Sequence, residues 1–363
     1  MRCRILYVVG QLGLGGLERQ LSYLLRAMDR SRYLPAVVVW NFSQNDAYVS
    51  RIQELNVPFY NISTQSSKVT KLREFRRLAR QLSPEVVHSY SFYTNFAAWY
   101  AALGSDAIPI GSIRRDFVTE RPAAGRILGS LSAYLPPSHI CNSHAAKNTI
   151  ESSSFVLRSA PLALVRNRLD IHQFVPKPLP QQRVTLLAVG SLYQEKRWDR
   201  LLNCIAALAS RGLEFTVRHA GEGPLKTSLQ DQAKHLGIDH LVEFMGLQND
   251  IFPLFRDSTF LVHTADAEGS PNVVMEAMAC GRAVVATDAG DVPYLVDDGI
   301  TGFVVDRGDS VALVDRMARL ITEPDLCNRM GQAGRRKAER EFGLDRLVSE
   351  TLDAYRAFGW RDA

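Results

Sequence analysis

Two glutamates stand eight positions apart in a short segment that is otherwise nearly free of charge. The segment reads EGSPNVVMEAMACG over residues 268–281, and its carboxylates are Glu268 and Glu276. Residues 273–279 are apolar except for Glu276, which is the composition of a buried helix. A buried carboxylate is strongly penalised unless donors face it, and ribose hydroxyl groups are such donors. The pattern predicts a ribose-binding Glu276 and a sugar-facing Glu268, the alternative being a structural glutamate paired with a core arginine.

The start of the same helix offers a place for a phosphate group. Ser270 followed by Pro271 is the pattern of an N-cap with proline in the first turn, and Cys280–Gly281 is a typical helix end. The backbone N–H groups of Asn272 and Val273 would point out of the helix start, which carries partial positive charge. We therefore expect a phosphate site beside the two carboxylates.

Short β-rich runs alternate with amphipathic helices, and these elements must position the motif. In the first half we expect strands at 4–9, 36–40, 86–88, 108–113 and 139–142, and helices at 17–28, 68–82 and 95–103. Ser143 is expected to cap a further helix. In the second half we expect strands at 184–189, 214–219, 259–263, 283–287 and 303–305, and a helix at 198–210. Such alternation predicts parallel, doubly wound sheets.

A proline-rich stretch divides this pattern. Residues 174–183 read FVPKPLPQQR and are typical of a linker. A chain of 363 residues also favours two domains, at about 100–200 residues each. We predict an N-terminal domain over 1–173 and a C-terminal domain over 184–345, with a last helix in 346–363 that crosses back to the first domain. The predicted fold class is α/β, with two Rossmann-like doubly wound parallel-sheet domains facing each other across a cleft.

Composition excludes several classes of protein. With 46 % hydrophobic and 22 % charged residues, the chain is neither disordered nor a coiled coil. No window approaches the roughly 18 apolar residues of a membrane helix, and the apolar run at 5–9 is too short for a signal peptide. The five cysteines form no C-x-x-C pair, so we predict neither a disulfide framework nor a zinc site. A reducing, cytoplasmic setting fits best.

Charge is unevenly divided along the chain. Residues 1–175 contain 21 basic and 11 acidic side chains, whereas the remainder contains 22 and 27. This asymmetry favours an anionic partner for the first half, with solubilising surface helices as the alternative. No nucleic-acid-binding motif is present, so we expect no nucleic acid and favour an anionic membrane surface or a phosphorylated lipid acceptor.

One basic amphipathic segment supports the expectation of an anionic membrane surface as partner. Within 68–82, Leu72, Phe75, Leu78 and Leu82 follow helical spacing, and arginines fill the other faces. The segment is first of all predicted to be a crossover helix that packs on a sheet. Its basic face would contact lipid headgroups, which predicts a peripheral position at the inner membrane face.

The segment EGSPNVVMEAMACG resembles the donor-binding motif of the family 4 retaining glycosyltransferases, which have the two-domain GT-B fold. Five further motifs resemble that family in the same order along the chain. They are GGLE at 15–18, NRLD at 167–170 with Phe174, VGSL at 189–192 with Lys196, GEGP at 221–224 and FMG at 244–246. Each motif alone is weak, but six in order are specific.

The resemblance implies roles for individual residues. Lys196 would bind the donor diphosphate, Glu268 would contact the donor sugar, and Glu276 would hold the nucleotide ribose. Lys196 and Glu268 are thus the implied catalytic residues, and neither a metal nor a cofactor is expected. The other implied donor-binding positions are Gly15, Gly16, Ser191, Gly221, Glu222, Met245, Gly246, Leu247, Gly269, Ser270, Asn272 and Val273.

Part of this pattern is altered or ambiguous on the donor side. Ser191 stands where many members have arginine, so the diphosphate site lacks one cation. Arg197 or Arg218 would have to compensate. Gly15 and Gly16 would let the backbone approach the diphosphate or acceptor closely, and the alternative is a plain strand–helix turn.

The acceptor side also departs from the family pattern. Arg114, Arg115 and Asp116 follow the strand after which many members carry a histidine. Arg114 would contact the diphosphate or acceptor and Asp116 would orient the acceptor hydroxyl, with surface ion pairs as the alternative. His88 ends a predicted strand and is either an acceptor contact or a core histidine.

The resemblance implies a retaining transfer from a nucleotide-diphosphate sugar, UDP- or GDP-linked, to a glycan or polyprenyl-linked acceptor. Bacterial surface polysaccharide or lipopolysaccharide assembly would be the setting. A nucleotide-sugar 2-epimerase and a non-catalytic nucleotide-sugar-binding homologue on the same fold remain alternatives. A dinucleotide-dependent dehydrogenase is disfavoured because the loop at 13–18 has Glu18 where the G-x-G-x-x-G fingerprint needs glycine.

Overall fold

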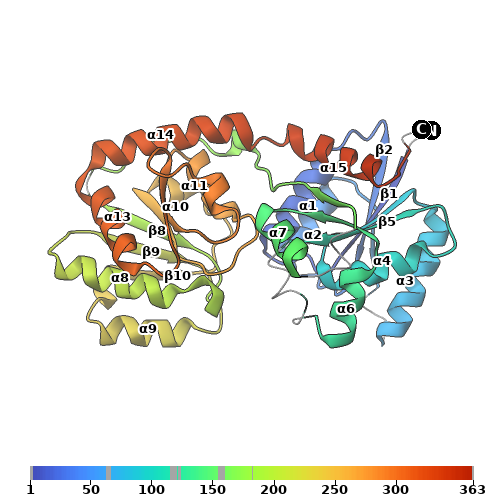
Figure 1. Ribbon diagram of the computed structural model, residues 1–363, viewed down its shortest axis with the longest axis horizontal. Coiled ribbons are helices and arrows are strands. Elements are labelled where there is room, and N and C mark those ends of the chain that lie inside the picture. Colours follow the sequence, from blue (N-terminus) through green and yellow to red (C-terminus); the bar gives the residue numbers. More distant parts are fainter. Residues whose placement is uncertain are drawn as a thin grey trace. The chain divides into compact units, whose positions relative to one another are not determined.

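The chain folds into two compact units in a computed structural model, which describes residues 3–62, 67–114, 121, 124–153, 160–181 and 183–361. Unit 1 comprises Met1–Arg168 with Leu344–Ala363, and unit 2 comprises Leu169–Gly343 (Figure 1). The division falls after Arg168, ahead of the predicted linker. Phe174 lies in unit 2 because its buried ring packs edge-on against Phe252.

Unit 1 contains a seven-stranded parallel sheet in the order β3-β2-β1-β4-β5-β6-β7. Its strands are β1 (Cys3–Val9), β2 (Tyr33–Val39), β3 (Phe59–Asn61), β4 (Val86–Ser89), β5 (Ile108–Ile113), β6 (Ser138–Cys141) and β7 (Leu162–Leu164). The chain adds strands outward from β1 to β3 and then returns to the other side of β1. The strand order therefore reverses between β1 and β4, and ligands of doubly wound sheets bind at such a point.

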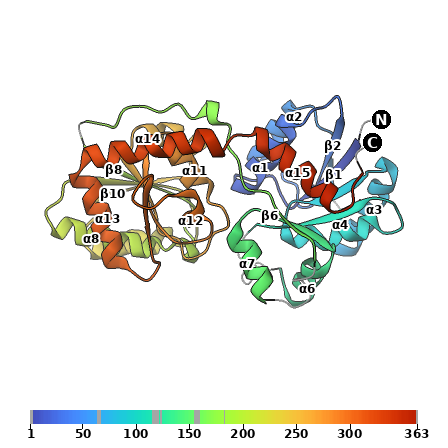
Figure 2. The same cartoon turned by 45° about the horizontal axis from the view of Figure 1, so that its top comes forward.

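Helices cover both faces of this sheet (Figure 2). They are α1 (Gly16–Ala27), α2 (Ala47–Glu54), α3 (Lys68–Leu82), α4 (Asn95–Ala102), α6 (Arg126–Tyr134), α7 (His144–Ser153) and α15 (Asp345–Ala357), with a 3₁₀ turn η1 at Phe92–Thr94. The predicted helix at 68–82 is confirmed with the same bounds, and it buries Phe75 against the sheet. The Ser143 cap is confirmed as well, since Ser143 Oγ accepts from the Ala146 N–H at 3.0 Å.

The last residues of the chain belong to unit 1. The hydroxyl of Tyr355 on α15 lies 2.8 Å from Nδ1 of His88, which is on β4. Trp360 Nε1 donates to the Glu85 carboxylate at 3.2 Å. These contacts hold α15 against the face of the sheet opposite to the one that α3 and α4 cover.

Unit 2 contains a six-stranded parallel sheet in the order β10-β9-β8-β11-β12-β13. Its strands are β8 (Thr185–Val189), β9 (Thr216–Ala220), β10 (Val242–Gly246), β11 (Phe260–His263), β12 (Ala283–Thr287) and β13 (Gly302–Val305). The order reverses between β8 and β11. The carboxyl ends of these two neighbouring strands are therefore the expected ligand position in this unit.

The helices of unit 2 surround this sheet. They are α8 (Trp198–Ser210), α9 (Lys226–His235), α10 (Phe252–Arg256), α11 (Asn272–Ala279), α12 (Val292–Leu295), α13 (Ser310–Thr322) and α14 (Pro324–Glu341), with 3₁₀ turns η3 (Ile171–Gln173), η4 (Gln194–Lys196) and η5 (Asp239–Leu241). The helix α11 packs against β11, β12 and α14, which explains why it is apolar almost all round. Over the described residues of both units, no helix combines the length and apolarity needed to cross a membrane.

Candidate active site

Lys196 and Glu268 meet at the point where the strand order of unit 2 reverses. Lys196 ends the turn η4 that follows β8, and Glu268 lies on the loop that follows β11. Their side chains form a close ion pair between Lys196 Nζ and Glu268 Oε1. The structure thus brings together the two residues for which we predicted catalytic roles, 72 positions apart in the sequence.

The surroundings of Glu268 keep its carboxylate ionised. Burial by itself raises the pKa of this carboxyl group, but the Lys196 ammonium and a hydrogen bond from His263 outweigh it and lower the pKa to about 2. His263 Nε2 lies 3.0 Å from Glu268 Oε1. Glu268 is therefore an acceptor at neutral pH, suited to a sugar hydroxyl. An incoming diphosphate would compete with it for Lys196.

Glu276 lies completely buried in the middle of α11. The alternative interpretation pairs this carboxylate with a core arginine, and Arg282 is the largest fully buried side chain in unit 2. Its guanidinium instead donates to backbone carbonyl groups, among them those of Phe255 at 2.8 Å and Lys177 at 2.9 Å. The role of Arg282 is thus to hold two chain segments together.

The start of α11 differs from the prediction by one residue. Pro271, with φ −72° and ψ 108°, is the cap, and no side chain accepts a hydrogen bond there, so the prediction of Ser270 as N-cap is wrong. The physical reason is that the extended ψ of Pro271 delays the helix until Asn272. Ser270 and Asn272 are both buried beside the helix start, and the predicted helix end at Gly281 is confirmed by its φ of +71°.

Two glycine-containing loops touch through their backbones next to this point. Gly221 follows β9 with φ +153°, and a Cβ there would overlap the carbonyl oxygen of Gly190 after β8. A Cβ on Gly223 would lie 2.7 Å from backbone atoms of Leu192. The Leu192 N–H also donates to the Glu222 carbonyl at 2.9 Å. The absence of side chains on Gly221 and Gly223 is what allows these loops to pack.

The loop after β10 lies at the same edge of the sheet as the loops after β8 and β9. The Gly246 carbonyl accepts from the Gly221 N–H at 2.8 Å, and Gly246 has φ +71°. Met245 is partly buried and Leu247 is exposed. The predicted donor-binding residues of unit 2 therefore lie at or just after the carboxyl ends of β8, β9, β10 and β11, or in helix α11 that follows the last of these loops.

Both arginines proposed to compensate for Ser191 form ion pairs in this structure. Arg197 pairs with Asp199 at 3.0 Å and with Asp266 at 2.7 Å. Arg218 pairs with Glu243 on the neighbouring strand at 3.2 Å. Ser191 itself uses its carbonyl group to accept from Trp198 Nε1. Compensation by either arginine stays a prediction, and Lys196 is the lysine that pairs with Glu268.

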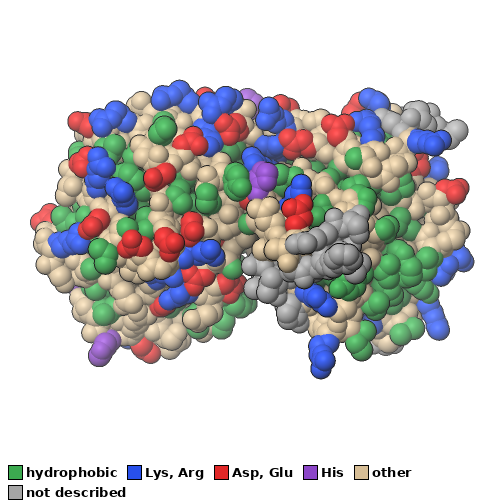
Figure 3. Space-filling model, in the orientation of Figure 1, with side chains coloured by type: hydrophobic (Ala, Val, Ile, Leu, Met, Phe, Trp, Pro, Cys, Tyr) green, Lys and Arg blue, Asp and Glu red, His purple; other side chains and the backbone are tan. Residues whose placement is uncertain are grey.

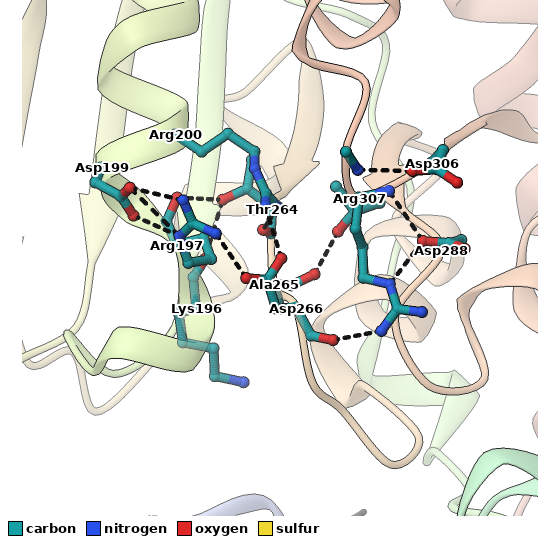
Figure 4. Close-up of polar contacts among 12 residues, drawn as sticks. Lys196, Arg197, Asp199, Arg200, Thr264, Ala265, Asp266, Asp288, Asp306 and Arg307 are labelled. Carbon is teal, nitrogen blue, oxygen red and sulfur yellow. Dashed lines mark hydrogen bonds and ion pairs between the residues drawn. The ribbon is translucent and has the colours of Figure 1, made fainter.

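Asp266 connects the loop that carries Glu268 to the turn that carries Lys196 (Figure 4). Sequence analysis did not predict this role of Asp266. Its carboxylate accepts from Arg197 and Arg200, each at 2.7 Å, and its N–H donates to the Glu195 carbonyl at 2.8 Å. In Figure 4 the side chain of Lys196 points away from this cluster. The only signal in the sequence is that oppositely charged residues stand in the segments after two strands, Arg197 after β8 and Asp266 after β11.

Two buried histidines at strand ends were also missed. His263 ends β11 and contacts Glu268, as described above. His219 lies near the end of β9 with its ring edge-on to Trp198, and burial lowers its pKa to about 4. Among the described residues, no group of three or more histidine, cysteine, aspartate or glutamate side chains is arranged to hold a metal ion.

In unit 1 the predicted glycine loop follows β1. Gly15 caps α1 in an extended conformation, and the helix begins at Gly16. The Glu18 carboxylate folds back over Gly15, where a Cβ would overlap it. Both glycines thus lie where the strand order of unit 1 reverses, and a Cβ on Gly15 would require the Glu18 carboxylate to move.

The acceptor-side residues of unit 1 are only partly described. His88 is buried, with Nδ1 at 2.8 Å from the Tyr355 hydroxyl and Nε2 at 3.0 Å from the Ser112 hydroxyl. Burial and the nearby Arg114 charge hold its pKa well below its usual value. Both ring nitrogens are engaged, which favours the core-histidine interpretation. Arg114 lies over the Tyr90 ring at 3.8 Å, whereas Arg115 and Asp116 lie outside the described residues.

Comparison with known proteins agrees with this geometry. Residues 183–323 match the family described as "Glycosyl transferases group 1". The chain is 31 % identical over 202 residues to EpsD of Bacillus subtilis, named as a glycosyltransferase, with 52 % of this chain and 53 % of EpsD covered. It therefore spans about half the length of this relative. EpsF of the same organism, also named as a glycosyltransferase, is 26 % identical with 98 % and 94 % covered.

Solved structures show the same fold along the chain. Anabaena Alr3699/HepE, in complex with UDP and glucose, has a TM-score of 0.84 at 18 % identity and covers 98 % of this chain and 100 % of its own. The lipopolysaccharide outer core galactosyltransferase WaaB has a TM-score of 0.77 at 18 % identity, with 98 % and 99 % covered. The chain thus has the two parallel sheets of the GT-B fold, and its residues 183–323 match the group 1 glycosyltransferase family.

Proposed function

We propose that this protein is a retaining, metal-independent glycosyltransferase that moves a sugar from a nucleotide-diphosphate donor to a glycan or lipid-linked acceptor. The observation that carries the proposal is the Lys196–Glu268 pair at the β8–β11 switch point, with Glu276 buried in the helix that follows. UDP is the favoured nucleotide, because the structural neighbour HepE was solved with UDP and with UDP-glucose.

The charges of the site suit a diphosphate leaving group. Lys196 and the N–H groups at the start of α11 would offset the negative charge that develops on the leaving oxygen. The ionised Glu268 would accept a hydroxyl group of the donor sugar and fix its orientation.

The bond between the anomeric carbon and the diphosphate oxygen breaks as the bond to the acceptor oxygen forms on the same face of the sugar. The acceptor proton passes to a leaving phosphate oxygen, so the reaction needs no dedicated base from the protein. Catalysis then rests on positioning and fixed electrostatics.

Bacterial surface polysaccharide or lipopolysaccharide assembly is the proposed setting, at the cytoplasmic face of the inner membrane. WaaB, a lipopolysaccharide galactosyltransferase by name, shares the fold. The basic first half of the chain suits a polyprenyl-diphosphate-linked acceptor.

A transfer assay tests the proposal. Purified protein is incubated with UDP-glucose, UDP-galactose, UDP-N-acetylglucosamine or GDP-mannose and a polyprenyl-diphosphate-linked sugar, and nucleotide release and glycolipid products are followed. We expect one donor to give acceptor-dependent nucleotide release and a product that retains the donor's anomeric configuration. Isomerisation of a nucleotide sugar without acceptor would instead establish an epimerase, and an inverted linkage would contradict the retaining mechanism.

A further inference from the structure

Helices α3 and α4 of unit 1 form a groove of about 550 Å³ whose charged lining groups are all positive. It is lined by Arg73, Arg76, Arg77, Arg80 and Gln81 of α3 and by Tyr100 of α4. The four arginines stand at positions i, i+3, i+4 and i+7, so they share one face of the helix. We call this feature the arginine groove.

Its arginines differ in how firmly they are held. Arg76 donates to the Leu103 carbonyl at 2.9 Å and lies 5.0 Å from the centre of the Tyr100 ring. Arg77 makes two hydrogen bonds to Glu74, at 3.0 and 2.6 Å. Arg73 and Arg80 are exposed, and no carboxylate among the described residues pairs with them. The groove therefore presents guanidinium groups open to an external anion, and their planar fork matches phosphate oxygens.

Aromatic side chains lie directly beside the groove. Phe96 of α4 packs against Trp99 at 5.6 Å and against Tyr100 at 6.4 Å between ring centres, and all three rings are partly exposed. Figure 3 shows apolar side chains gathered on the face of unit 1 over α4, with Lys and Arg side chains around them. Aromatic side chains of this kind favour the boundary between lipid and water.

We infer that the arginine groove and the aromatic face of α4 dock unit 1 on the surface of an anionic membrane. Arginines near a membrane are attracted to anionic headgroups, and adjoining aromatic rings enter the interface. Single-stranded nucleic acid fits less well, because bases stack on open ring faces and Arg76 already lies over the Tyr100 ring. The inference extends the proposed function by naming the surface that would face a lipid-linked acceptor, but it does not depend on the donor chemistry.

Vesicle binding by the full chain tests this inference. Co-sedimentation is measured with vesicles of phosphatidylcholine alone and of phosphatidylcholine mixed with phosphatidylglycerol, at fixed ionic strength. We expect binding only to the mixed vesicles. The triple variant Arg73→Gln, Arg77→Gln and Arg80→Gln removes three charges near the lipid, which should weaken binding by about 150-fold.

A matched control changes the same number of exposed arginines elsewhere. Arg329, Arg336 and Arg340 lie exposed along α14 of unit 2, and the control variant replaces all three with glutamine. It should bind mixed vesicles as the wild type does. An equal loss in both triple variants would show that total charge rather than the groove governs binding, and would overturn the inference.

Three other outcomes would also overturn it. These are wild-type binding by the groove variant, equal binding to neutral vesicles, and displacement from vesicles by single-stranded RNA or by inorganic pyrophosphate at unchanged ionic strength. The nucleotide-induced shift in melting temperature is recorded for each variant. The groove variant should keep that shift, so failure of this inference and failure of the donor site are distinguishable.

Discussion

Glu268 owes its charge to two neighbouring side chains, and its effect on stability should therefore depend on pH. Its pKa is lowered in the folded protein from an ordinary value near 4.5 to about 2. A lowered carboxyl pKa stabilises the fold above pH 4.5, and this contribution is lost as pH falls toward 2. At about 1.4 kcal/mol per pKa unit, the contribution is about 3 kcal/mol.

The measurement is the free energy of unfolding by urea between pH 6 and pH 3, for the wild type and for Glu268→Gln. The difference between the two proteins should shrink as pH falls through this window. A difference that stays constant with pH would show that Glu268 is not held ionised by Lys196 and His263.

Lys196 should matter to turnover as well as to stability, because it is the cation that pairs with the buried Glu268. Lys196→Ala removes the cation beside the leaving diphosphate, so kcat is expected to fall by about 100- to 1,000-fold. The control is Lys234→Ala, an exposed lysine on α9. Steady-state kinetics with the donor identified by the transfer assay give both values. Near-wild-type kcat for Lys196→Ala would remove Lys196 from the mechanism.

At the scale of single residues, the sequence predicted the charged residues of the site better than it predicted the residues that contact them. The spacing of Glu268 and Glu276 and their apolar surroundings are local features, so they can be read from a single segment. The contacts of Asp266 with Arg197 and Arg200 arise only because β8 and β11 are neighbours in the sheet. No local pattern encodes that pairing, and these contributors were missed.

At the scale of elements, Asp266 joins the loop after β11 to the turn after β8. Asp266→Asn would leave the buried Arg200 without its carboxylate partner, and we expect a loss of about 2 kcal/mol of stability together with a severalfold higher donor KM. Asp315→Asn is the control, since Asp315 makes an exposed ion pair with Arg211. Urea unfolding and donor kinetics are the measurements. An Asp266→Asn variant that behaves like the control would contradict a positioning role.

Elements with strong periodicity were predicted well and short or polar ones were not. The bounds of α3, α8, β5 and β12 agree with the sequence-based ranges. The three-residue edge strands β3 and β7 are too short to show a pattern. The long helix α14 is rich in charge, and it packs closely through Gly334, whose Cβ would lie 3.5 Å from Met278. Where small residues make the contact between two helices, the sequence shows little hydrophobic periodicity from which the helix could be predicted.

At the scale of the whole molecule, the chain returns to unit 1 at its end. Tyr355 on α15 hydrogen-bonds His88 and also donates to the Tyr7 hydroxyl at 3.3 Å. Tyr355→Phe removes the hydroxyl group that pairs with Nδ1 of the buried His88 and should cost about 1–2 kcal/mol. Tyr193→Phe, at an exposed position, should leave the urea unfolding midpoint unchanged. Equal midpoints for the two variants would show that the Tyr355 hydroxyl does not stabilise the fold.

The domain organisation could be anticipated only in outline. Strand–helix alternation and a proline-rich break predict two α/β domains, and the comparisons show the GT-B fold. The boundary differs because Phe174 packs in unit 2, where its carbonyl group accepts from Arg335 and that of Lys177 accepts from Arg282. Prolines mark a chain without regular hydrogen bonding, but they do not tell which core that chain covers.

The central claim is that unit 2 binds a nucleoside diphosphate through Glu276 and Lys196. The most direct measurement is the melting temperature with UDP, GDP, ADP, CMP, NAD and NADP, for the wild type and for Glu276→Gln. A ligand at about 100 times its Kd stabilises by roughly 2.7 kcal/mol, and each kcal/mol corresponds to about 2–4 °C. We predict a shift with one nucleoside diphosphate, UDP first, that Glu276→Gln abolishes. A shift with NAD or NADP alone, or a UDP shift of equal size in Glu276→Gln, would contradict the account.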